Sequence, residues 1–208
     1  MNKTRQDSIS DVRPASLPRL LVEVRACKLC AGHLPLPPRP ILQLDSRATI
    51  LIAGQAPGRK AHETGVPFND ASGVRLRSWM GVDSATFYDA TQVAILPMGM
   101  CFPGTGASGD LPPRPECAPA WRSQLLAALP KLQLTLVIGS FAQAWHLRTN
   151  ATLSVTDAVA SWREHWPHVL PMPHPSLRNQ RWLVNNPWFE AEVLPVLRER
   201  IKALTEMR

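Results

Sequence analysis

The chain has 208 residues, 45% of them hydrophobic, so it is long enough to bury a core without cross-links. It has no apolar run of roughly 18 residues and no signal-peptide pattern, so we expect a cytoplasmic protein with no membrane partner. The formal net charge is +7 and arginine outnumbers lysine. This favours a polyanionic partner, most simply nucleic acid, because a guanidinium group binds phosphate through two hydrogen bonds.

Apolar runs alternate with helical patterns along most of the chain. Residues 1–15 are polar and without periodicity, so we expect a disordered tail followed by a single domain over residues 16–208. The predicted strands are 50–53, 92–96, 134–138 and 169–172. The predicted helices are 17–26, 73–81, 83–89, 120–129, 139–147, 155–162 and 187–204. This alternation predicts an α/β fold, a three-layer α/β/α sandwich with a central four-stranded parallel sheet.

The loop after the first strand is the first candidate site. In open α/β sheets, ligands bind beyond the carboxyl ends of the strands. The strand ends at Gly54, and the polar loop that follows carries the carboxamide of Gln55, the aromatic ring of Phe68 and the carboxylate of Asp70. An ordinary strand-to-helix connection, with Asp70 as a helix cap, is the simpler interpretation.

The fourth strand leads to a second candidate segment at the same sheet edge. It delivers His174, and Leu177, Arg178 and Arg181 follow in the next loop. The arginines suit phosphate contacts, and an exposed leucine suits insertion into a base stack. The simpler interpretation makes His174 a hydrogen-bonded core residue, Leu177 a core residue and the arginines a solvated surface.

The four cysteines form a third candidate site. Cys27 and Cys30 are separated by two residues, and Cys101 and Cys117 flank an irregular segment rich in Gly and Pro. Four thiolates suit either tetrahedral zinc or a four-iron cluster, and spacing alone does not choose between them. Plain buried thiols are the remaining alternative.

Taken together, these segments resemble the uracil-DNA glycosylase superfamily over nearly the whole chain. The run 54–58 (GQAPG) is similar to the first active-site motif, 65–68 (GVPF) to the Gly-x-Pro-Phe segment, and 174–176 (HPS) to the second motif. The cysteine spacing resembles the iron–sulfur branches called families 4 and 5. The chain departs from these patterns at Gln55, where family 4 has Glu, at Ala56, where family 1 has a catalytic Asp, and at Pro97, where family 4 has a uracil-reading Asn.

The resemblance implies a monomeric DNA glycosylase that removes uracil or another deaminated base from double- or single-stranded DNA. Asp70 would stabilise the sugar cation, and His174 and the backbone near Gln55 would stabilise the leaving base. The resemblance also implies a 4Fe-4S cluster on the four cysteines, with zinc as the alternative. The implied substrate-binding residues are Gly54, Ala56, Phe68, Ser176, Leu177 and Arg178.

Two other functions stay open on the sequence alone. The departures at Gln55 and Pro97 favour a catalytically weak or inactive binder of uracil-containing or single-stranded DNA. An unrelated α/β enzyme acting on a small phosphorylated molecule is the other, although the chain has no Gly-x-x-x-x-Gly-Lys phosphate loop.

Overall fold

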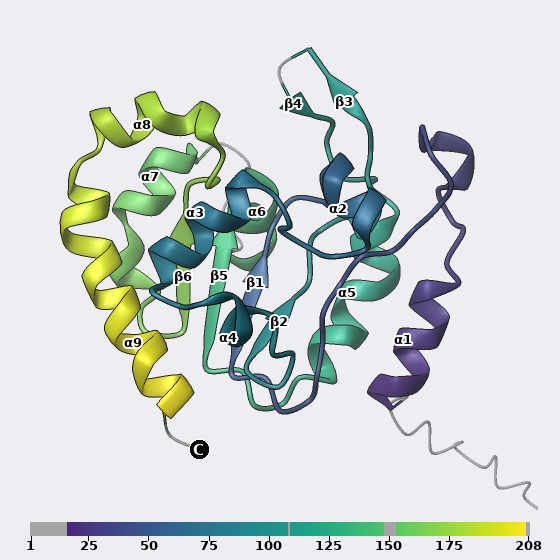
Figure 1. Cartoon of the computed structure of the whole chain (residues 1–208), viewed down its shortest axis with the longest axis horizontal. Coiled ribbons are helices and arrows are strands. Elements are labelled where there is room, and N and C mark those ends of the chain that lie inside the picture. Colours follow the sequence, from purple (N-terminus) through teal and green to yellow (C-terminus); the bar gives the residue numbers. More distant parts are fainter. Residues whose placement is uncertain (1–15, 108, 148–152, 207–208) are drawn as a thin grey trace, which may run out of the picture.

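A computed structural model describes residues 16–107, 109–147 and 153–206, so the predicted tail over residues 1–15 lies outside the described residues. The predicted α/β sandwich with a four-stranded parallel sheet is confirmed, and the strand order is β2-β1-β5-β6 (Figure 1). The strands are β1 (Ile50–Ala53), β2 (Val93–Ile95), β5 (Leu134–Ile138) and β6 (Val169–Met172). All four are apolar and almost fully buried, because helices cover both faces of the sheet.

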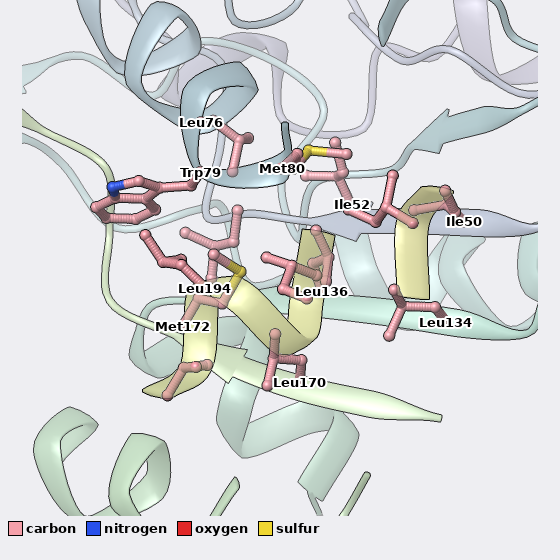
Figure 2. Packing of buried hydrophobic residues seen from close by; sticks show 14 of the residues in the cluster. Ile50, Ile52, Leu76, Trp79, Met80, Leu134, Leu136, Leu170, Met172 and Leu194 are labelled. Carbon is pink, nitrogen blue, oxygen red and sulfur yellow. The ribbon is translucent and has the colours of Figure 1, made fainter. Parts of the chain in front are cut away.

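The strand side chains alternate between two hydrophobic layers. Ile50 and Ile52 point to the layer that also holds α3 (Ala71–Met80), α4 (Ser84–Tyr88) and α9 (Leu194–Glu206). Figure 2 shows Trp79 and Met80 of α3 packing over this layer. The alternate strand residues, such as Leu51, join the opposite layer with α1 (Leu17–Arg25) and α5 (Cys117–Ala127). Two further helices are α6 (Ser140–Leu147), which packs under β5, and α7 (Val155–Ala160), which packs under β6.

Several short elements differ from the sequence prediction. The loop after β1 contains α2 (Arg59–Thr64), a six-residue helix between Gly58 and a left-handed Gly65, too short to show periodicity. The segment predicted to be irregular contains a hairpin of β3 (Thr105–Gly106) and β4 (Gly109–Asp110). The loop after β6 contains a 3-10 turn (Leu177–Asn179) and α8 (Gln180–Asn185).

Two predicted helix boundaries were also wrong, each for a reason connected with proline. Helix α5 begins at Cys117 rather than at residue 120, because Pro119 is tolerated in the first turn. The last helix begins with a π-helical segment (Phe189–Val193) before α9. Pro195 has no N–H to donate, and the helix widens just before it.

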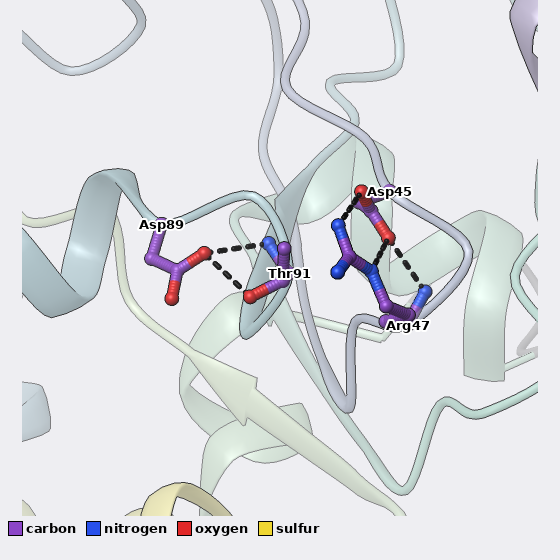
Figure 3. A network of polar contacts seen from close by, with 4 residues as sticks. All are labelled: Asp45, Arg47, Asp89 and Thr91. Carbon is purple, nitrogen blue, oxygen red and sulfur yellow. Dashed lines mark hydrogen bonds and ion pairs between the residues drawn. The ribbon is translucent and has the colours of Figure 1, made fainter.

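Polar turns precede β1 and β2, and Figure 3 shows the side chains that stabilise them. The Asp45 carboxylate accepts hydrogen bonds from the Arg47 backbone N–H and guanidinium at 2.8–2.9 Å. The Asp89 carboxylate accepts from the backbone N–H and hydroxyl of Thr91. These turns fix the amino ends of β1 and β2.

None of the helices in the described ranges is both long enough and apolar enough to cross a membrane.

Candidate active site

A cavity of about 420 Å³ opens at the carboxyl edge of the sheet. It is lined by three segments that are far apart in the sequence: the loop after β1, the loop after β6 and the β3–β4 hairpin. The predicted site residues in its wall include Gln55, Phe68, Asp70 and His174. Gly54, Ala56, Ser176 and Arg178 also line it. The volume falls within the range of about 300–1,000 Å³ that is usual for small-ligand sites.

The turn before α3 holds the Phe68 ring in this cavity. Phe68 has a positive φ of 53°, a conformation that costs a non-glycine residue free energy and is often found at functional sites. The Tyr88 hydroxyl donates to the carbonyls of Pro67 and Phe68 at 3.1 and 3.3 Å. The ring tip lies 3.5 Å from the point where a side chain on Gly54 would begin. The glycine therefore lets the tip of the Phe68 ring lie close to the backbone of the β1 loop.

Asp70 is a helix cap, as the simpler interpretation held, and it also lines the cavity. One carboxylate oxygen, Oδ1, accepts a hydrogen bond from the Gly73 backbone N–H at 2.9 Å and caps α3. The other, Oδ2, points toward the turn at Gly58 inside the cavity. Capping fixes the orientation of the carboxylate and so keeps Oδ2 on the cavity side.

His174 lies across the same cavity and has a defined tautomer. Its Nδ1 accepts a hydrogen bond from the Ser176 backbone N–H at 3.1 Å, so the neutral ring carries its hydrogen on Nε2. Asn179 fixes the segment by donating to the His174 carbonyl at 2.8 Å. Burial lowers the pKa of His174 below its ordinary value of 6.5, against the opposing effect of the negative charges on Asp70 and Asp110.

The lowered pKa predicts how His174 responds to acid. We expect an NMR titration of the ring to show a midpoint below pH 6.5, so that His174 is neutral at pH 7. The unfolded chain then binds a proton between pH 6.5 and that midpoint while the folded chain does not, so this group removes stability as the pH falls through that window. In Asp70→Asn, which removes an opposing negative charge, the midpoint should fall further. A midpoint at or above 6.5 in the wild-type protein would contradict this description of the site.

The structure adds a role for Gln55 that the sequence did not indicate, and it adds a further residue, Asp110, to the cavity wall. The Gln55 carboxamide donates to the Leu111 carbonyl at 2.9 Å and so holds the base of the β3–β4 hairpin. Asp110 on that hairpin lines the cavity, and sequence reasoning missed it. The available signal was the run of Gly, Thr and Ser before Asp110, a composition typical of a loop that folds closely against other backbone.

The loop after His174 places its predicted DNA-contacting side chains on the surface. Leu177 is 59% exposed and lines a neighbouring groove rather than the cavity, while Arg178 reaches the cavity wall. Arg181 is exposed on α8. Arg75 of α3 holds the loop by donating to the Ser176 carbonyl at 3.1 Å. This hydrogen bond ties the loop after β6 to α3.

The four cysteines lie near one another, brought together from the segment after α1, the loop after β2 and the start of α5. Burial raises the pKa of the Cys101 thiol to about 12, and the nearby Cys30, Cys117 and Cys27 add to the rise. The Trp121 indole N–H donates to the Cys27 sulfur and the Met100 backbone N–H to the Cys117 sulfur, both at 3.3 Å. Within the described residues, no group of three or more His, Cys, Asp or Glu is arranged to hold a single metal ion.

Comparison with known proteins identifies the family of this chain. The model of the uracil DNA glycosylase superfamily matches residues 42–198, three quarters of the chain. The chain belongs to the uracil DNA glycosylase superfamily. Among solved structures, it is similar to the solution NMR structure of a protein from Methanosarcina acetivorans described as a candidate uracil DNA glycosylase. The two are 19% identical with a TM-score of 0.47, and the match covers 78% of this chain and 97% of the other.

Membership in this superfamily makes the departures from its patterns more informative. Ala56 and Pro97 both line the cavity, so the positions at which the resemblance expected polar side chains are apolar here. Polar groups in the cavity wall come from other positions, among them Asp70, His174 and Asp110.

Proposed function

We propose that this protein is a monofunctional DNA glycosylase that hydrolyses the N-glycosidic bond of uracil or another deaminated base in DNA. The observation that supports the proposal best is the meeting of Phe68, Asp70 and His174 in one cavity. Members of the superfamily act on DNA, and the net charge of +7 favours a polyanionic substrate.

Each side chain has a task in this chemistry. A base inside a duplex is out of reach, so it must be flipped into the cavity, where the Phe68 ring would stack on it. As the bond breaks, positive charge develops on the sugar and negative charge on the base. The Asp70 carboxylate would stabilise the first, and the Nε2–H of neutral His174 would donate to a base carbonyl and stabilise the second.

The surrounding surface would hold the DNA while the base is extruded. The exposed Leu177 would fill the gap in the base stack, and Arg178 and Arg181 would contact phosphates. Salt should therefore weaken binding.

The experiment that tests the proposal is base release from oligonucleotides that each contain one uracil, hypoxanthine or xanthine, single-stranded and paired. We expect release of at least one of these bases by the wild-type protein and its loss in His174→Ala. Failure of the purified protein to release any of them would refute the enzymatic function. Tight binding to one of these oligonucleotides without release would instead support the second candidate, a non-catalytic binder, which the apolar Ala56 and Pro97 favour.

We also propose that Cys27, Cys30, Cys101 and Cys117 hold a 4Fe-4S cluster, with zinc as the alternative. Each thiolate of such a cluster binds a different iron, so the sulfurs would stand farther apart than around one zinc ion. When bound, the cluster would fix α1 and the loop after β2 to the start of α5. It is a structural group here, and no step of the proposed reaction passes through it.

Cys117→Ser is expected to abolish iron binding and to destabilise the fold. Loss of a cross-link of this kind costs about 2 kcal/mol or more, which corresponds to a fall in Tm of roughly 4–8 °C. Iron content, visible absorbance and thermal unfolding measure the effect. The matched control is Ser123→Ala on the exposed side of the same helix, which should change none of these. Full iron content in Cys117→Ser, or zinc in place of iron in the wild-type protein, would contradict the cluster.

A further inference from the structure

A second carboxylate faces the cavity in addition to Asp70. Asp110 lies on β4 of the short hairpin between Cys101 and Cys117, and it lines the same cavity as Asp70 and His174. It is exposed at the mouth of the cavity, and its negative charge is felt at the His174 ring. The protein has a net charge of +7, and we have proposed that it binds DNA. An acidic side chain at the entrance would repel the DNA phosphates. A positive charge in the substrate would account for its position.

The Asp110 carboxylate is oriented toward Asp70. The Thr105 hydroxyl donates to its Oδ1 at 3.3 Å. Its Oδ2 lies 3.2 Å from the point where a side chain on Gly58 would begin, and the Asp70 Oδ2 lies 3.9 Å from that same point. The two free carboxylate oxygens therefore converge on the turn at Gly58, and the missing side chain there leaves the space between them open.

The hairpin that carries Asp110 is held in position at its base. Gln55 donates to the Leu111 carbonyl at 2.9 Å, and the Leu111 backbone N–H donates to the Gly104 carbonyl at 2.8 Å. On its other side the Arg178 guanidinium approaches to 3.0 Å from the point where a side chain on Gly109 would begin. The hairpin is thus held by a hydrogen bond from the loop after β1 and lies close to the loop after β6.

We propose that Asp110 is a second catalytic carboxylate, which together with Asp70 holds the nucleophilic water and stabilises the sugar cation. The inference rests on the proposed glycosylase function. Carboxylates only accept hydrogen bonds, so two of them fix both hydrogens of one water and leave its lone pair free to attack. Ala56 in the cavity wall offers no polar group for this task.

The reaction balances with these groups. The bond between C1′ and the base nitrogen breaks, and its electron pair leaves with the base. The water oxygen bonds to C1′, and the proton that it loses passes to one of the two carboxylates. That proton returns to the solvent, the base takes up one proton, and the products are the free base and an abasic sugar.

The first experiment measures single-turnover release of every base that the wild-type protein releases. Asp110→Asn is expected to lower all of these rates by about fiftyfold or more, and Thr105→Val, which removes only the hydrogen bond to Asp110, by a few-fold. The matched control is Glu63→Gln, which removes an exposed negative charge on α2 outside the cavity wall and should stay within twofold. Rates for Asp110→Asn within threefold of wild type, or a large loss confined to one base, would overturn the proposal, because the latter would make Asp110 a base-reading residue.

A second experiment separates failure of this proposal from failure of the proposed function. Binding is measured to an oligonucleotide with a pyrrolidine nucleotide, whose protonated ring nitrogen imitates the sugar cation, and to one with a neutral tetrahydrofuran. We expect the wild-type protein to prefer the cationic analogue by at least tenfold and Asp110→Asn to lose most of that preference. An unchanged preference in Asp110→Asn overturns the proposal, whether or not the wild-type protein releases a base.

Discussion

Asp70→Asn is expected to slow base release about a thousandfold while leaving the fold intact. The carboxylate would supply the negative charge that stabilises the developing sugar cation, and electrostatic or general-base groups of this kind are worth about 10²–10⁴ in rate. Asparagine caps a helix about as well as aspartate, so the hydrogen bond from the Gly73 N–H should persist and the stability should change by less than about 0.5 kcal/mol. Single-turnover release and thermal unfolding measure the two effects separately.

The chain offers a matched control for this substitution. Asp83 caps α4 by accepting from the Thr86 backbone N–H at 2.8 Å, and it lies outside the cavity wall. Asp83→Asn should therefore leave both base release and stability near wild type. If Asp70→Asn retained full activity, or lost activity only in proportion to lost stability, Asp70 would be a cap and nothing more.

Gly73→Ala is expected to destabilise the protein and to disrupt the cavity at the same time. A methyl group on Gly73 would lie 1.7 Å from the Phe68 carbonyl oxygen and 2.7 Å from its carbon. Both are backbone atoms of a turn held by the Tyr88 hydroxyl, so the overlap cannot be relieved by rotating a side chain. We expect a loss of roughly 3 kcal/mol, the upper end of the usual overpacking cost, and a fall in Tm of about 6–12 °C.

The effect on activity should exceed what unfolding explains. At temperatures where Gly73→Ala is still folded, displacement of Phe68 and Asp70 should lower base release by at least tenfold, because misplaced catalytic groups lose their orientation. The control is Gly32→Ala, since nothing lies within 4 Å of the added methyl group there. It should leave Tm and rate unchanged. A Gly73→Ala protein with wild-type Tm and activity would contradict the close packing of this turn.

The sheet and the first half of the site could be predicted because their signals are local. The strands β1, β5 and β6 are short apolar runs bounded by polar residues, and their predicted bounds agree with the structure. Since parallel strands end at one edge of a sheet, the loops carrying Phe68, Asp70 and His174 could be expected to meet there.

The remaining features depend on contacts that the sequence does not display. The position of Asp110 is set by a hairpin whose base is held by Gln55. The hydrogen bond runs from Gln55 to Leu111, and these two residues are 56 positions apart in the chain. The short helix α2 is bounded by Gly58 and Gly65, residues that read equally well as a loop. The Phe68 backbone packs against Gly73, and its carbonyl accepts a hydrogen bond from Tyr88. The residues next to Phe68 in the sequence do not indicate these contacts, so its conformation could not be predicted.

The most direct measurement of the central claim is a crystal structure of Asp70→Asn bound to DNA that contains a base the wild-type protein releases. We predict an extruded base stacked on Phe68, with the His174 Nε2 within hydrogen-bond distance of a base carbonyl. A bound duplex whose target base stays stacked, or one that enters the molecule away from this cavity, would contradict the account.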